Sequence, residues 1–350
     1  MFGEKLTILR KQRGYSLRYL AEKLNLSHTA INKFEKNILK PDSKTLIQIC
    51  QFFDVKPAYF YYKPLANIEI KDIKYRKKSA LSKKNLEIIE YKTREKIEKF
   101  FELKSFFPEN RFFNIDISDI TYEINNLDEI ENLSIEIRKK LNLGEESIPN
   151  LLEVLEENGF FILFIENFKG FDGKQGFAND IPFIVLSENK SGDRQRFNLA
   201  HELGHILIKN NENLDSEKVA NMFAGCLLIP ANSLLKELGE KRQSISLHEL
   251  GELKKKYRVS MQSIIMRAFQ LKIISERKKE ELFKCFSMNK WRQNEPIQIE
   301  IEHTDKFKRL VCEAVVEGYI SESKGAEYLN ITTSDFIKEY LKGLNYEVHN

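Results

Sequence analysis

The stretch Arg196–Ile208, RFNLAHELGHILI, carries two histidines, His201 and His205, four residues apart. The apolar residues around them have the spacing of a buried helix, and we predict a helix from about Gly192 to Lys209. Residues four apart share one face of a helix, so both imidazoles can bind a single cation. Glu202 lies beside them, where it can take a proton from an attacking water molecule. This H-E-x-x-H spacing predicts a metal site with a general base.

A tetrahedral metal site needs a further protein ligand. The next stretch, DSEKVANMFAGCLLIP, begins at Asp215 and predicts a second helix that carries Glu217. Glu217 can complete a His₂Glu site for Zn²⁺, and Asn221, one turn later, can hold a ligand histidine by its second nitrogen. The alternative is a pair of surface histidines that binds no metal.

The residues before this pair of helices change their periodicity. Helical patterns run from Leu127 to Leu143 and from Ile148 to Glu157. Three β-rich runs follow, GFFILFIE at 159–166, KQGFAND at 174–180 and IPFIVLSE at 181–188, broken by Gly and Asp. We expect a small antiparallel sheet in an α+β domain, followed directly by the metal-binding helix.

The first sixty residues have a different organisation. Residues 2 to 62 predict five short helices, with Ser16, Ser27 and Asp42 in or next to capping positions. Ala21 is small where two helices cross at a tight turn. A charged connector follows and leads into a long helix from about Ser82 to Phe106, which Pro108 ends.

The C-terminal part predicts mainly helices. Residues 244–275 contain a helix, a turn and a helix, and PIQIEIE at 296–302 is a β-like run. Three further helices end near Leu341. Because the stretch between residues 320 and 341 has two lysines and four acidic residues, we expect a structural or dimerising role there rather than phosphate contacts.

Charge is unevenly distributed along the chain. Residues 1 to 100 hold 23 Lys/Arg and 11 Asp/Glu, a balance of +12, whereas the remainder holds 33 and 41, a balance of −8. A basic head on an acidic body is typical of a nucleic-acid-binding module joined to another domain. The four cysteines are scattered without a C-x-x-C pair, which argues against a thiolate metal cluster. Without a long apolar run or a signal-peptide pattern, we expect a cytoplasmic protein with no membrane contact.

The run SLRYLAEKLNLSHTAINKFEKNILKPDSKTLIQICQFFDV, from Ser16, resembles the lambda-repressor-like (XRE) helix-turn-helix family. The S-x-x-x-L-A opening, the F-E-K-N exit and the following P-x-x-x-x-L carry the resemblance over about sixty residues. It implies double-stranded operator DNA as a partner, with the third helix in the major groove, and tight binding would require a homodimer. The residues implied at base edges are His28, Thr29, Asn32 and Lys33, and those near phosphates are Arg18 and Ser27. Leu17 stands where many relatives carry Gln.

The metal-site residues carry a second resemblance. The patterns R-x-R-F-x-L-A-H-E-L-G-H and E-x-x-A-N-x-F-A-x-x-L-L-I-P look like the ImmA/IrrE family of metallopeptidases, over roughly residues 120 to 275. The resemblance implies that His201, His205 and Glu217 bind zinc and that Glu202 is the general base. It also implies a regulatory role, since some relatives of the same layout cleave a partner repressor.

Together these patterns predict a mainly α chain with a small sheet. We expect a five-helix helix-turn-helix domain at 1–63, a charged helical linker at 64–110, an α+β zincin-like metallopeptidase domain at 111–275 and a helical C-terminal region at 276–350. Two functions compete: a DNA-binding regulator whose zinc endopeptidase cleaves a repressor, and a regulator or antitoxin whose zinc is structural or sensory. A third possibility is an enzyme whose helix-turn-helix binds only protein. The protein substrate, operator, inducing signal and oligomeric state are not encoded in any pattern that we recognise.

Overall fold

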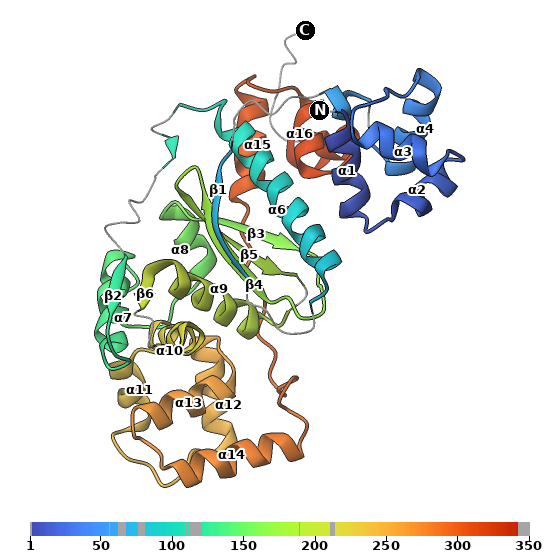
Figure 1. Ribbon diagram of the computed structural model, residues 1–350. Coiled ribbons are helices and arrows are strands. Elements are labelled where there is room, and N and C mark those ends of the chain that lie inside the picture. The colour runs from blue at the N-terminus through green and yellow to red at the C-terminus, as the bar shows by residue number, and fades with distance from the viewer. Residues whose placement is uncertain are drawn as a thin grey trace.

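The computed structural model describes residues 2–55, 57–61, 68–75, 81–108, 111–112, 121–188, 190–210 and 214–341 (Figure 1). The chain is mainly helical with a small sheet, as the sequence predicts. Helices at the N-terminus form one unit, an α+β unit holds the sheet, and further helices follow it.

Five helices form the N-terminal unit: α1 (Phe2–Gln12), α2 (Leu17–Lys23), α3 (His28–Glu35), α4 (Ser43–Phe53) and α5 (Ala58–Tyr61). The predicted caps are present, because Ser16, Ser27 and Asp42 each accept a hydrogen bond from the backbone N–H three residues later. Leu20 and Ile31 lie in the buried core that joins these helices.

The main sheet has the strand order β1-β4-β5-β3. Its strands are β1 (Ile70–Tyr75), β3 (Phe161–Ile165), β4 (Gly173–Ala178) and β5 (Ile181–Ser187). The prediction of a purely antiparallel sheet is wrong, because β3 pairs with β5 in parallel, while β4 is antiparallel to both neighbours. Asn179 and Asp180, both with positive φ, form the tight turn that pairs β4 with β5. β3 therefore adds to the opposite side of β5.

Both faces of this sheet are covered. Alternate residues of β3 and β5 enter two different cores, as the two-residue period of a strand requires. Ile184 faces a core shared with α9 (Gly192–Leu207) and α10 (Ser216–Leu228), whereas Val185 faces a core shared with α6 (Lys83–Lys104). Figure 1 shows α6 and α9 on opposite sides of the sheet.

The interval predicted as a linker contributes to this architecture. β1 lies at one side of the sheet, and α6 takes the place of the long helix predicted after Ser82, which caps it. Ile89, Ile97 and Phe100 of α6 are buried against β3 and β5, so the helical spacing seen in the sequence reflects a packed helix. The predicted boundaries after residues 63 and 110 lie outside the described residues and stay predictions.

The remaining α+β elements border the metal-site helices. α7 (Glu129–Lys140) and α8 (Leu151–Glu157) precede β3, and β2 (Tyr122–Ile124) pairs in parallel with β6 (Ile208–Asn210), which directly follows α9. The parallel pair anchors the end of α9.

The helices after α10 occupy two places. The first group packs around the α9–α10 core, and the second, with Val311 and Phe336 buried, packs against the end of α6 near Leu103. Their bounds are α11 (Ala231–Leu238), α12 (Leu247–Tyr257), α13 (Met261–Gln270), α14 (Glu276–Met288), α15 (Lys306–Val316), α16 (Glu322–Leu329), α17 (Thr333–Phe336) and the π-helix η3 (Ile337–Leu341).

Residues 295–302 join the two groups in an extended segment, here called the strap. The β-like run predicted at 296–302 is not a strand. The strap instead crosses the start of α9, where Gly192 N–H donates to Ile299 O at 3.1 Å. Its alternation of Ile with Gln or Glu resembles a strand, but burial does not follow this alternation, since Ile301 is 41% exposed and Glu302 is buried.

The strap leaves no room for a side chain at position 192. A Cβ on Gly192 would lie 2.1 Å from the backbone O of Glu300, so we expect Gly192→Ala to destabilise the domain by about 1–3 kcal/mol. Trp291, the single tryptophan, packs near Phe286 and reports unfolding by its fluorescence. Gly225→Ala is the control, because its nearest neighbour atom would be 4.0 Å away. Equal stability of the two variants would contradict the close contact.

Among the described residues, no helix is by itself both long and apolar enough to cross a membrane. α10 and α11, which meet at a bend of 60°, reach that length and composition only when taken as a pair.

Candidate functional site

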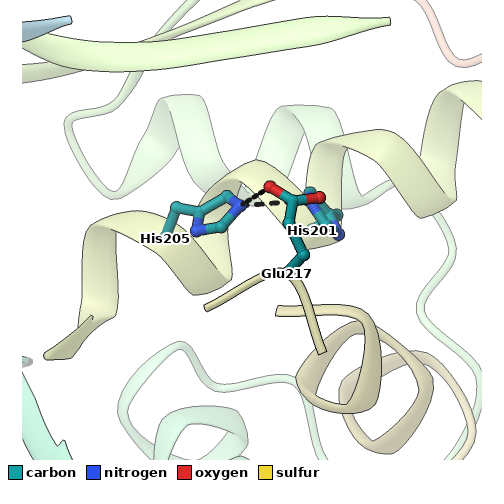
Figure 2. Close-up of side chains that lie close together, drawn as sticks. All are labelled: His201, His205 and Glu217. Atoms are coloured by element: carbon teal, nitrogen blue, oxygen red, sulfur yellow. Dashed lines mark hydrogen bonds and ion pairs between the residues drawn. The ribbon is translucent and has the colours of Figure 1, made fainter. Parts of the chain in front are cut away.

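The two histidines of α9 lie one turn apart on its inner side. His201 is fully buried and His205 is partly buried, and their Nε2 atoms are 3.1 Å apart. Figure 2 shows both rings extending from the same helix toward one point. The 3.6-residue period of the helix therefore brings the imidazoles together as predicted.

Glu217 reaches the same point from α10. Asp215 caps α10 by accepting hydrogen bonds from Glu217 N–H at 2.9 Å and Lys218 N–H at 3.3 Å, which places Glu217 in the first helical turn. Its carboxylate oxygens lie 3.2 Å from His205 Nε2 and 3.5 Å from His201 Nε2 (Figure 2). All three ligand atoms lie within 4.8 Å of one another.

This donor set fits a tetrahedral zinc ion. Bonds of about 2.05 Å in tetrahedral geometry separate the ligand atoms by about 3.3 Å, and the separations here are 3.1, 3.2 and 3.5 Å. The Glu217 side chain is 44% exposed, so the cluster opens to solvent on that side. An open side is typical of catalytic rather than closed structural zinc sites.

Asn221 contacts His201 at Nδ1, the ring nitrogen that is not the one near Glu217. It lies one turn after Glu217 on α10, and its Oδ1 is 3.0 Å from Nδ1 of His201. When the Nδ1–H of His201 donates to this amide oxygen, Nε2 keeps its lone pair and points toward Glu217. Asn221 thus lies where the sequence predicted a residue that holds the second ring nitrogen of a ligand histidine.

Glu202 lies on α9 beside His201 and is buried, 1% exposed. It packs against the first residue of β4, since a Cβ on Gly173 would lie 2.8 Å from Glu202 Oε1 and 3.0 Å from its Cγ. The glycine therefore makes space for this carboxylate. Sequence reasoning missed Gly173, although an isolated Gly at a strand end can mark close approach of another group.

Gly173→Ala tests this contact. We expect the added methyl group to displace the Glu202 carboxylate and to lower any peptidase rate by about 10–100-fold, with zinc content unchanged. Zinc is measured by elemental analysis, and the rate by cleavage of a protein substrate. Gly225→Ala on α10 should leave both near their wild-type values. If Gly173→Ala lost zinc, the added methyl group would be disturbing the metal ligands rather than the Glu202 carboxylate.

Gly204, within H-E-x-x-H, allows α9 and α10 to approach closely. A Cβ there would lie 2.9 Å from the Phe223 ring and 3.3 Å from Cα of Ala220. Close approach of the helices brings the Glu217 carboxylate within reach of the histidines. The sequence contained the signal, a glycine inside a helical pattern, which often has a packing reason.

The strap holds α9 before its metal-site residues. Gln195 Nε2 donates to Glu302 O at 3.0 Å and its Oε1 accepts from Glu302 N–H at 2.7 Å, so the side chain pairs with the strap as another backbone would. The Arg196 guanidinium forms a buried ion pair with the Glu302 carboxylate. Burial lowers the pKa of Arg196, and the Glu302 carboxylate opposes this shift. No local signal in the sequence indicates this partner.

The recognition surface predicted on the helix-turn-helix is exposed. His28, Thr29 and Lys33 are exposed on α3, and Asn32 is partly exposed. Arg18 on α2 is exposed too. Ser27 caps α3 by accepting from Ala30 N–H at 3.0 Å, and its hydroxyl proton can still donate to a phosphate. The side chains predicted to contact DNA are thus accessible on adjoining elements.

Comparison with protein families agrees with both parts of this description. Residues 6–60 match the helix-turn-helix family model, and residues 162–269 match the model of the IrrE N-terminal-like domain, a peptidase family. The chain therefore joins an XRE-type helix-turn-helix to an ImmA/IrrE-like metallopeptidase domain, which confirms both resemblances. The first match supports DNA binding, and the second implies a metal, usually zinc. A search of curated proteins found no match.

Proposed function

We propose that the chain is a DNA-binding transcriptional regulator whose second domain is a zinc-dependent endopeptidase. Its helix-turn-helix would bind an operator, and its peptidase domain would cleave a partner repressor in the cytoplasm. The observation that carries the proposal is the convergence of His201, His205 and Glu217 on one point that is open to solvent. A closed site with four protein ligands would favour structural zinc instead.

Each residue has a role in this proposal. His201, His205 and Glu217 would hold zinc, which when bound polarises a carbonyl and makes water acidic. Glu202 removes the proton of the attacking water and returns it to the leaving amine. Because Glu202 is buried and packs against Gly173, its carboxylate is held in place and shielded from bulk water. Asn221 fixes the ring of His201.

The helix-turn-helix would bring the peptidase to the operator where its substrate is bound. Co-expression with the repressor encoded nearest its gene, followed by mass spectrometry of fragments, tests the proposal. We expect discrete repressor fragments with the wild type and intact repressor with His201→Ala, which removes a proposed ligand. His248→Ala, at an exposed histidine of α12, is the control and should leave cleavage unchanged. Intact repressor in every case would reject this substrate class.

DNA binding by the first domain has its own prediction. Phosphate contacts make affinity fall with salt, so binding to the chain's own upstream DNA should weaken steeply between low and moderate salt. Arg18→Ala should weaken binding and reduce the slope of log affinity against log salt by about 1, because Arg18 is the exposed basic residue predicted near a phosphate. Lys241→Ala, an exposed lysine far along the chain, should change neither. Salt-independent binding would favour a helix-turn-helix that binds only protein.

A further inference from the structure

Strand β4 lies directly against the proposed base. Gly173, its first residue, is the residue whose Cβ would approach Glu202 Oε1 to 2.8 Å. β4 pairs with β5 on one side and with β1 on the other. A strand on the outer side of β4 pairs as far as Lys174, so one of its ends lies beside the residue that follows Gly173.

β1 comes from the segment between the helix-turn-helix and α6, outside the match to the IrrE-like domain. The matched part supplies β3, β4 and β5. With these strands alone, β4 would be an edge strand with unpaired N–H and C=O groups beside the site. Such an edge binds extended polypeptides by strand addition. A Cβ on Gly176 would lie 3.0 Å from Lys71 O, so β4 also lacks a side chain where its neighbour's backbone comes close.

We propose that this outer edge of β4 is the docking edge for an extended polypeptide substrate and that β1 is its built-in occupant. A substrate must displace β1 before its backbone can lie beside Glu202, and the peptidase is latent while β1 is paired. The inference rests on the proposed endopeptidase function and adds to it how the substrate binds and what blocks it.

The pairing of β1 is suited to displacement. Ile70 and Lys71 pair with Ala178 and Phe177, but the register shifts by one residue before Lys74 and Tyr75, which interrupts the ladder. The β3–β5 pairing, by contrast, runs through five consecutive residue pairs without a shift. β1 also has the outermost place in the strand order, with β4 as its only neighbour there. It is therefore the strand of this sheet that can leave with the least disruption.

The helix-turn-helix is placed to control this displacement. β1 lies between α5 and α6, and α6 is joined to α1 by an ion pair of Lys11 with Glu87 at 3.0 Å. Gln12 Nε2 also donates to Glu95 of α6 at 2.7 Å. A partner that moves the N-terminal unit relative to α6 would pull on the segment that contains β1. Operator binding and access to the peptidase site are thereby coupled.

A labelled peptide with the sequence of residues 69–75 tests whether β1 can be replaced. The released variant is Lys71→Pro/Lys74→Pro, which removes backbone N–H groups, and its matched control is Lys71→Ala/Lys74→Ala. All proteins also carry Glu202→Gln so that the peptide stays intact. The binding is measured by fluorescence anisotropy. We expect the released variant to bind the peptide about tenfold or more tightly than the protein with the wild-type β1 sequence or the alanine control does, since only the released variant presents a free edge of β4. Equal affinities, or no binding to the released variant, would overturn the inference.

A reversible disulfide that holds β1 on β4 tests the inference in the opposite direction, in a chain that keeps Glu202. Ile70 and Ala178 are opposite one another in the ladder, so Ile70→Cys/Ala178→Cys can form a cross-strand disulfide. We expect the oxidised lock to cleave casein or the co-expressed repressor at least about tenfold more slowly than its reduced form, with single-cysteine variants unaffected by reduction. Equal cleavage by locked and reduced protein would reject the inference and leave the endopeptidase standing. Peptide binding to the released variant without cleavage by any form would support the docking edge and reject the endopeptidase.

Discussion

Glu202→Gln is expected to abolish measurable repressor cleavage while zinc stays bound at about one ion per chain. The amide is nearly the shape of the carboxylate, so packing against Gly173 is kept. It cannot accept a proton, and the loss of a general base lowers rates by roughly 10²–10⁴-fold. Because Glu202 is not one of the three converging ligands, the zinc site stays complete.

This variant separates the two competing functions, whereas removal of a ligand such as His201 does not. An endopeptidase carrying Glu202→Gln should leave the repressor intact and the regulated genes switched off. A regulator with structural or sensory zinc should act normally. Glu252→Gln, on the exposed face of α12, is the matched control and should behave as wild type. Normal regulation by Glu202→Gln in a reporter strain would reject the enzyme.

The parts of the fold that the sequence predicted well depend on local signals. Caps such as Ser16, Ser27 and Asp42 act within three residues, and they delimit the first helices correctly. The same holds for His201 and His205, because a helix fixes the relative position of residues four apart. The proposed site was thus largely foreseeable once α9 was recognised as a helix.

Contacts between distant segments were not foreseeable. The pairing of β1 with β4 joins segments about a hundred residues apart, and the residues of neither strand indicate which strand it pairs with. The run at 296–302 alternates Ile and Glu like a strand, yet its backbone partner is the side chain of Gln195 rather than another strand. Periodicity does not show which residues are buried by a distant partner: Ile301 is exposed, whereas Glu302 is buried in its ion pair with Arg196.

The buried ion pair of Arg196 and Glu302 is expected to have the largest effect on stability. Their side chains are 0% and 3% exposed, and Glu302 Oε2 also accepts from Leu152 N–H at 3.1 Å. Glu302→Gln leaves a buried guanidinium without its counter-charge, and Arg196→Met leaves a buried carboxylate. Each should destabilise the domain by about 3–5 kcal/mol, because the desolvation cost of the remaining charge is no longer offset.

The double variant Arg196→Met/Glu302→Gln removes both charges and keeps an oxygen for Leu152 N–H. We expect it to be only about 1–2 kcal/mol less stable than wild type, far less than the sum of the single changes. Urea unfolding followed by Trp291 fluorescence measures all four proteins, since Trp291 packs near Phe286 close to the start of the strap. If the single losses simply added in the double variant, the strap would be held by its backbone contacts with Gln195 and not by the ion pair. Because Arg196 lies only five residues before His201 on α9, the coupling energy measures how firmly the strap fixes the start of the metal-site helix.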